Sequence, residues 1–203
     1  MQVTLLPIEL PRWDQAPPAD AICIPLWSDV RPLRGAAGLL DWRMCGRLSA
    51  MMAAGKVTGA EGEQTLFPSA GRLPWRLVLA LGAGARRDFN EARLVAGLRR
   101  ALKATAGLGA RRLAYALPGR DGERIVAGSP SSVPASRRAL DLVLQELDGG
   151  AAPLDELTVI APGAAGKELA EVLRLRAVRA SAEVPRVGVP AKRAGRAPRA
   201  SKI

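Results

Sequence analysis

The stretch best suited to hold an anion is "GAGARRDFNEARLVAG" at positions 82–97. It follows an apolar run and leads into a helical pattern, and the backbone N–H groups of such a turn can bind a phosphate. Gly82 and Gly84 would let the backbone approach the anion. Arg86 and Arg87 would add positive charge. However, Arg87 stands where the dinucleotide-binding pattern needs its third glycine, and the P-loop lysine is missing, so we favour a tight strand-to-helix turn.

A second stretch, "RGAAGLLDWRMCGRLSAMMAAGKVTGAEGE" at positions 34–63, contains a thiol and a carboxylate that could act as nucleophile or ligand. Cys45 has neither a histidine nor a second cysteine at a useful spacing, and Glu63 has no second ligand near it. We expect both Cys23 and Cys45 to be buried small hydrophobic residues in a reducing compartment. The glycines that follow the helical part fit helix termination and a tight turn. We therefore interpret the whole stretch as scaffold.

The chain contains no histidine, which excludes histidine-based catalytic triads, histidine general bases and most zinc sites. Asp121 and Glu123 lie in a polar loop, but two carboxylates form an acid–base pair only if separation and burial set their pKa values apart. We favour a solvated loop. Ser131 and Ser132 have no histidine base, and one of them is suited to cap a helix.

The composition is strongly basic, with a net charge of +11 over 203 residues. Such a balance favours polyanions or an acidic protein partner, although arginine richness also follows from genome base composition. Residues 179–203 are rich in proline and cations and are predicted to form a disordered basic tail. Its cations could bind nucleic-acid phosphates, or the tail could simply aid solubility. These cations are Arg186, Lys192, Arg193, Arg196, Arg199 and Lys202.

Nothing in the sequence predicts a membrane span or a bound cofactor. No run of about 18 apolar residues occurs, and the N-terminus lacks the basic segment of a signal peptide. The two cysteines have no metal-ligand spacing. We therefore expect a cytoplasmic protein without a metal or cofactor.

Hydrophobic periodicity predicts six strands and four helices around one core. The expected strands cover residues 3–10, 21–27, 62–68, 75–82, 111–118 and 154–162. The expected helices cover residues 36–54, 88 or 90 to 105, 134–147 and 164–178. Strands that alternate with helices indicate a mostly parallel sheet covered on both faces, and the early strand pairs indicate an antiparallel edge. The sequence therefore predicts one three-layer α/β domain over residues 1–178.

Four local patterns occur in an order that is typical of a known family. "LLDW" opens a helix, "GKVTGAEGE" makes a turn before a strand, "LGAG" ends a strand, and "EARLVAG" opens the next helix. In this order and spacing they resemble the N-terminal domain of the leucyl (cytosol) aminopeptidase family over about residues 3–162. The resemblance implies a macro-like α/β fold.

The same resemblance implies that the family's chemistry resides elsewhere. Family members carry a second domain with a two-metal centre, whose ligands are carboxylates and a lysine, and a signature "Asn-Thr-Asp-Ala-Glu-Gly-Arg" that is missing here. No residue matches a family ligand, so we expect a stand-alone, non-catalytic domain that binds, regulates or organises an oligomer. Its partner would be a second copy or a peptidase catalytic chain. Two alternatives stay open: nucleic-acid binding through the tail, and macro-type binding of a nucleotide or ADP-ribose.

Overall fold

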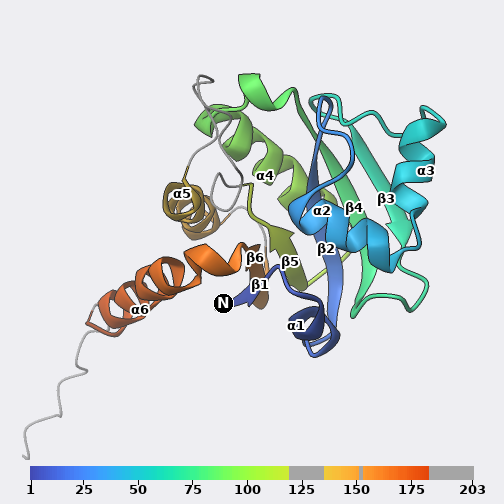
Figure 1. Ribbon diagram of the computed structural model, residues 1–203. Coiled ribbons are helices and arrows are strands. Elements are labelled where there is room, and N and C mark those ends of the chain that lie inside the picture. Colours follow the sequence, from blue (N-terminus) through green and yellow to red (C-terminus); the bar gives the residue numbers. More distant parts are fainter. Residues whose placement is uncertain (119–134, 151–152, 183–203) are drawn as a thin grey trace, which may run out of the picture.

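The computed structural model describes residues 1–118, 135–150 and 153–182, which form a sheet between two layers of helices (Figure 1). The strands are β1 (Gln2–Pro7), β2 (Ala19–Trp27), β3 (Gln64–Pro68), β4 (Trp75–Gly84), β5 (Arg112–Ala116) and β6 (Glu156–Ala161). Their order in the sheet is β1-β6-β5-β2-β4-β3. β3 is antiparallel to β4, and the other pairs are parallel. The predicted α/β class, with an antiparallel edge on a parallel sheet, is confirmed.

The inner strands form where apolar residues are buried on both faces of the sheet. Successive side chains of a strand point to opposite faces. In β2, Ile22 and Ile24 pack on one face, whereas Ala21 and Cys23 pack on the other. β2 pairs with β4 on one side and β5 on the other, so its continuous apolar sequence reflects burial on every side. Pro7 lies at the end of the edge strand β1, as its missing N–H group predicts.

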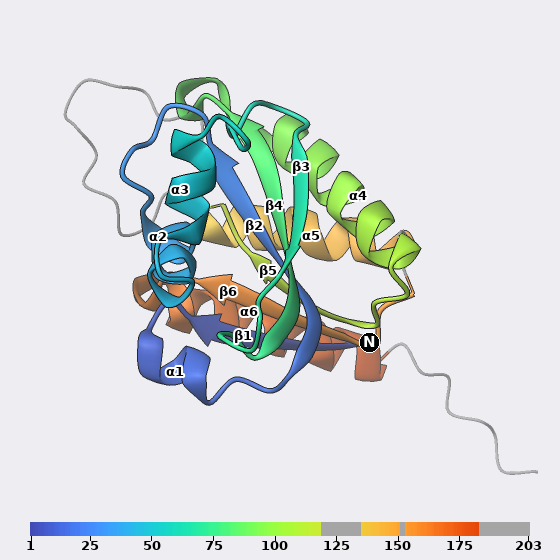
Figure 2. The same ribbon diagram turned by 90° about the vertical axis from the view of Figure 1, so that its right-hand side faces the viewer.

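The helices divide into two groups, one on each face. They are α1 (Leu10–Asp14), α2 (Gly35–Arg43), α3 (Arg47–Ala53), α4 (Glu91–Gly107), α5 (Ser136–Asp148) and α6 (Gly166–Ala182). α1, α2 and α3 pack against one face through Trp13, Leu40 and Leu48. α4, α5 and α6 cover the other face. Figure 2 shows the strands between α3 and α4. We call these groups the α1–α3 layer and the α4–α6 layer.

The α4–α6 layer is built from amphipathic helices that bind one another at the surface. In α4, Leu94, Leu98 and Leu102 are fully buried at the predicted four-residue spacing. Of the two predicted starts, residue 90 is the one observed: Asn90 caps α4, and its Oδ1 accepts the N–H of Arg93 at 3.0 Å. Ion pairs then link α4 to α5 and α5 to α6 across the layer. These pairs are Arg99–Glu146, Arg138–Glu91, Arg137–Glu168 and Arg176–Asp148.

The α1–α3 layer corrects two sequence predictions. The single helix expected over residues 36–54 is two helices, because the backbone turns left-handed at Cys45 and Gly46, with φ of 55° and 75°. The Asp41 carboxylate stabilises this break by accepting the N–H of Leu48 at the start of α3. α1 was missed altogether, since five residues containing Pro11 are too short to show a helical period. The burial of Trp13 holds α1 in place.

Candidate functional site

Gly82 and Gly84, the proposed phosphate-binding glycines, lie beneath the loop between α3 and β3. The N–H of Gly82 donates to the carbonyl of Glu63 at 2.8 Å, and the N–H of Gly84 donates to the carbonyl of Gly59 at 2.9 Å. A Cβ at position 82 would lie 1.8 Å from the carbonyl oxygen of Ala60, and Gly84 has a φ of +76°. Close packing of the loop therefore explains both glycines. A phosphate at this turn would have to be held by other N–H groups.

Arg86 and Arg87 lie in a short 3₁₀ turn between β4 and α4. The backbone N–H of Arg86 donates to the Asp29 carboxylate at 2.9 Å. The Arg87 side chain is exposed, with Nε 3.8 Å from Oδ1 of Asp88. α4 begins only after this turn, at the Asn90 cap. The sequence suggested one anion site made of the glycine turn and the helix N-terminus, but the structure separates these two features. The role of the two arginines stays a prediction.

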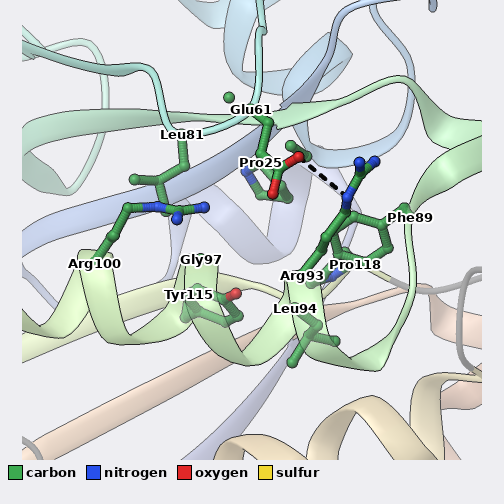
Figure 3. Close-up of a pocket in the computed structure, with 12 residues that line it drawn as sticks. Pro25, Glu61, Leu81, Phe89, Arg93, Leu94, Gly97, Arg100, Tyr115 and Pro118 are labelled. Carbon is green, nitrogen blue, oxygen red and sulfur yellow. Dashed lines mark ion pairs between the residues drawn. The ribbon is translucent and has the colours of Figure 1, made fainter.

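Beside this turn, a crevice lies between the loop before β3 and α4 (Figure 3). Arg93 of α4 crosses it to Glu61, with Nε 3.1 Å from Oε2. Tyr115 of β5 lines it from the core, and burial raises the pKa of Tyr115 well above its usual value. The enclosed volume is about 20 Å³, which is roughly the space of one water molecule. In this conformation the crevice contains an ion pair and is too small for a nucleotide.

The loop before β3 is organised by Glu63, whose role sequence reasoning did not identify. Its carboxylate accepts the N–H groups of Thr58 and Gly59 at 2.9 and 2.6 Å, and also the Thr58 hydroxyl at 3.0 Å. Burial by itself raises the pKa of Glu63, but these hydrogen bonds outweigh it and hold the pKa below its ordinary value. These hydrogen bonds explain how the stretch serves as scaffold. Glu63, at the end of the "T-G-x-x-x-E" pattern, closes the loop over Gly82.

The break between α2 and α3 opens a broad depression on the α1–α3 layer, of about 670 Å³. Trp42 of α2 borders it with 63% of its surface exposed. The Arg43 guanidinium lies 5.6 Å from the centre of the Trp42 ring. Arg72 enters from the loop before β4 and places Nη1 2.9 Å from Sγ of Cys45. Sequence reasoning overlooked this site because it treated the region as one continuous helix.

The two cysteines have different environments, and the prediction that both are buried is wrong. Cys23 is fully buried in β2, and burial raises the pKa of its thiol well above the usual value. Cys45 is exposed, because the left-handed turn places it outside the helix packing.

Several predicted groups lie outside the described residues. These are Asp121, Glu123, Ser131, Ser132 and the six cations of the tail, Arg186, Lys192, Arg193, Arg196, Arg199 and Lys202. Among the residues that are described, no group of three or more cysteine or acidic side chains is arranged to hold a metal ion. Within the same ranges, none of the helices has the length and apolar character that crossing a bilayer requires.

Solved structures with a similar arrangement of strands and helices include a leucine aminopeptidase and several macrodomains. Tomato leucine aminopeptidase is similar with a TM-score of 0.56 and 16% identity, over 80% of this chain and 33% of that chain. The macrodomain of Thermus aquaticus DarG matches with a TM-score of 0.54 and 13% identity, over 79% of this chain and 99% of that one. The Trypanosoma brucei macrodomain in complex with ADP matches with a TM-score of 0.52 and 21% identity, over 78% and 62%. At these identities the likeness establishes a macro-like fold.

Sequence comparison identifies the family. No curated protein sequence gives a significant match. The chain spans about a third of the length of the tomato enzyme. The model of the cytosol aminopeptidase family N-terminal domain matches residues 24–131, more than half of the chain. That range contains the early helical stretch, the loop closed by Glu63 and the glycine turn at the end of β4. The chain therefore belongs to the cytosol aminopeptidase family, to whose N-terminal domain it corresponds.

Proposed function

We propose that this domain is non-catalytic and acts by binding protein, as an organising or regulatory element of a peptidase assembly. The partner is a second copy of the chain or a peptidase catalytic chain. The observation that carries this proposal is the exposure of Trp42 beside the α2–α3 depression. An indole in water is an unfavourable arrangement for a large apolar side chain, and tryptophan and arginine dominate the energetics of protein interfaces.

The environments of the other three tryptophans support this interpretation. Trp13 and Trp75 are 1% and 0% exposed and pack edge to face, with ring centres 5.0 Å apart. Trp27 packs edge to face on the buried Phe89. Three of the four indoles thus stabilise the fold, whereas Trp42 contributes little to it. Its position is better explained by an interaction outside the domain.

The first experiment tests the absence of catalysis. The purified full chain is incubated with a leucyl chromogenic substrate, alone and with added Mn²⁺ or Zn²⁺. We expect no hydrolysis above the rate in buffer, because no metal-binding cluster occurs among the described residues. Hydrolysis that is abolished by a chelator and that co-purifies with the chain would overturn the non-catalytic assignment.

The second experiment tests protein binding. Sedimentation velocity of the full chain, alone and mixed with a leucyl aminopeptidase, is compared between the wild type and Trp42→Ala. We expect a species heavier than the monomer in the wild type and its loss in the variant. Identical sedimentation of the two proteins under every condition would reject the Trp42 face as the binding surface.

Two alternative functions, nucleic-acid binding and nucleotide binding, each make a testable prediction. If the basic tail binds nucleic acid, deletion of residues 184–203 abolishes a binding that is steeply salt-dependent. If the fold binds a nucleotide as the Trypanosoma brucei macrodomain binds ADP, calorimetry with ADP-ribose gives heat. The narrow crevice beside Gly82 favours neither outcome over protein binding.

A further inference from the structure

We propose that the partner of the Trp42 face is an acidic segment of a different protein chain, rather than a second copy of this one. This inference rests on the proposed function and names the chemistry of the partner. The face consists of five residues that line the α2–α3 depression and of Arg47, which follows Gly46 at the start of α3. The five lining residues are Asp41, Trp42, Arg43, Cys45 and Arg72.

Two of the three arginines of this face, Arg47 and Arg72, have no carboxylate partner among the described residues. The only hydrogen bond that the Arg72 side chain makes within the described residues is to the thiol of Cys45, a weak and neutral acceptor. Arg47 lies over the Phe67 ring at 5.3 Å and reaches the Pro68 carbonyl at 3.5 Å, with no carboxylate within ion-pair distance among the described residues. Of these arginines, Arg43 alone is paired, with Asp14.

Asp41 is the one carboxylate of this face, and its oxygens are occupied by hydrogen bonds within the domain. Asp41 accepts the N–H groups of Leu48 and Ser49 at 2.8 and 3.0 Å, and it also accepts the Ser49 hydroxyl. It is largely buried, at 9% exposure. The face therefore presents positive charge to solvent, around an indole that can anchor an apolar residue.

A second copy of the chain is poorly suited to meet this face. The chain carries a net charge of +11, so two copies repel each other. Glu91, Glu146 and Asp155 are each engaged by both arms of an arginine guanidinium. Asp20 accepts the backbone N–H groups of Arg111 and Arg112. These carboxylates are already engaged within the domain, so they are poorly placed to complement the face of a second copy.

The test uses the full chain and a fluorescein-labelled peptide that is rich in glutamate and carries a central pair of leucines. Fluorescence anisotropy gives its affinity for the wild type, Trp42→Ala, Arg72→Gln and Arg72→Glu. Lys103→Glu is the matched control, because Lys103 is exposed on α4 in the opposite layer. It introduces the same charge change far from the face, and the basic tail is present in every protein. Circular dichroism confirms that each variant is folded.

We expect Trp42→Ala and Arg72→Glu each to weaken peptide binding by about tenfold or more. Arg72→Gln should have a smaller effect, and Lys103→Glu should change the affinity less than about threefold, since distant exposed charges are screened by salt. Equal affinities of the wild type and Trp42→Ala would overturn the inference. So would tighter, Trp42-dependent binding of oligothymidylate of equal charge, which would make the face a nucleic-acid site.

Failure of this inference and failure of the proposed function give different results. If Trp42→Ala abolishes self-association in sedimentation but no variant affects peptide binding, the partner is a second copy and the acidic-partner inference falls alone. If neither peptide binding nor association, with a second copy or with a leucyl aminopeptidase, depends on Trp42, both the inference and the proposed protein-binding role fall.

Discussion

The helices of the α4–α6 layer hold one another through arginine–carboxylate pairs, whereas α2 and α3 meet at the inward-turned Asp41 and leave Trp42 in solvent. The α4–α6 layer combines long helices, continuous leucine stripes and paired surface charges. The α1–α3 layer consists of short helices, and a left-handed turn joins α2 to α3. Beside that turn, Arg47 and Arg72 lack carboxylate partners in the described part of the chain. The α4–α6 layer therefore pairs surface charges within the domain. The α1–α3 layer exposes tryptophan and arginine, two residue types that are enriched at protein interfaces.

The largest expected difference between the layers is in the cost of removing an apolar side chain. Leu98→Ala in α4 should lower the free energy of unfolding by about 2–5 kcal/mol, because the side chain is fully buried. Trp42→Ala removes a larger side chain, but the change should stay within about 0.5 kcal/mol. Urea denaturation of the two variants measures both effects. A comparable loss in Trp42→Ala would mean that the indole stabilises the fold and is no interface residue.

The next effect concerns the joint between α2 and α3. Asp41→Ala removes the acceptor of two backbone N–H groups, one of them on the buried Leu48, so it should cost about 1–3 kcal/mol of unfolding free energy. Asp41→Asn keeps one acceptor oxygen and should recover part of this loss. If Asp41→Ala is as stable as the wild type, the carboxylate does not hold the turn at Cys45.

A smaller effect should appear in acid, and it concerns the α4–α6 layer. Hydrogen bonds from Arg138 and Arg99 hold the pKa values of Glu91 and Glu146 below the ordinary 4.5. A carboxylate with a lowered pKa stabilises the folded state above that ordinary value, and this contribution is lost as the pH falls through the folded pKa. Stability should therefore decline when the pH drops below 4.5.

The double variant Glu91→Gln, Glu146→Gln isolates this contribution. Its stability should decline less steeply with falling pH than that of the wild type, and the difference should shrink in high salt because both pairs are exposed. Thermal unfolding between neutral and acidic pH measures it. Parallel pH profiles of the two proteins would show that the pairs do not stabilise this layer.

The last difference between the layers concerns thiol reactivity rather than folding stability. Cys45 is exposed on the α1–α3 layer, whereas Cys23 is fully buried beneath α4–α6 and its pKa is raised by that burial. An aromatic disulfide reagent should therefore modify one thiol in the native protein and the second only in denaturant. Cys45→Ser should remove the native reaction. Reaction of both thiols at equal rates would contradict the packing around β2.

The fold was largely predictable because its information is local. The apolar runs of β2 and β4 and the leucine repeat of α4 identify a sheet with helices on both faces, and Asn90 indicates where α4 begins. The candidate interface was not predictable, because it depends on a break that the hydrophobic period hides. Leu40, Met44 and Leu48 keep a helical spacing through the turn at Cys45 and Gly46.

Long-range contacts also changed the interpretation of the glycine turn. Nothing in "LGAG" reveals that the loop before β3 lies on Gly82, or that the carbonyl of Glu63 in that loop accepts the Gly82 N–H group. Likewise, the sequence does not show that Arg72 reaches Cys45 from a distant loop. Such pairings arise when strands far apart in the chain become neighbours, so a local pattern predicts the turn but not what covers it.

Quenching of tryptophan fluorescence tests most directly whether the Trp42 face is an open, positively charged binding surface. Iodide should quench the wild type more strongly than caesium, and Trp42→Phe should lose this component, because the other three indoles lie in edge-to-face packing within the fold. Saturation with the glutamate-rich peptide should protect Trp42 from iodide. If the peptide is bound and the quenching of Trp42 is unchanged, the acidic partner binds elsewhere and the face is not the docking site.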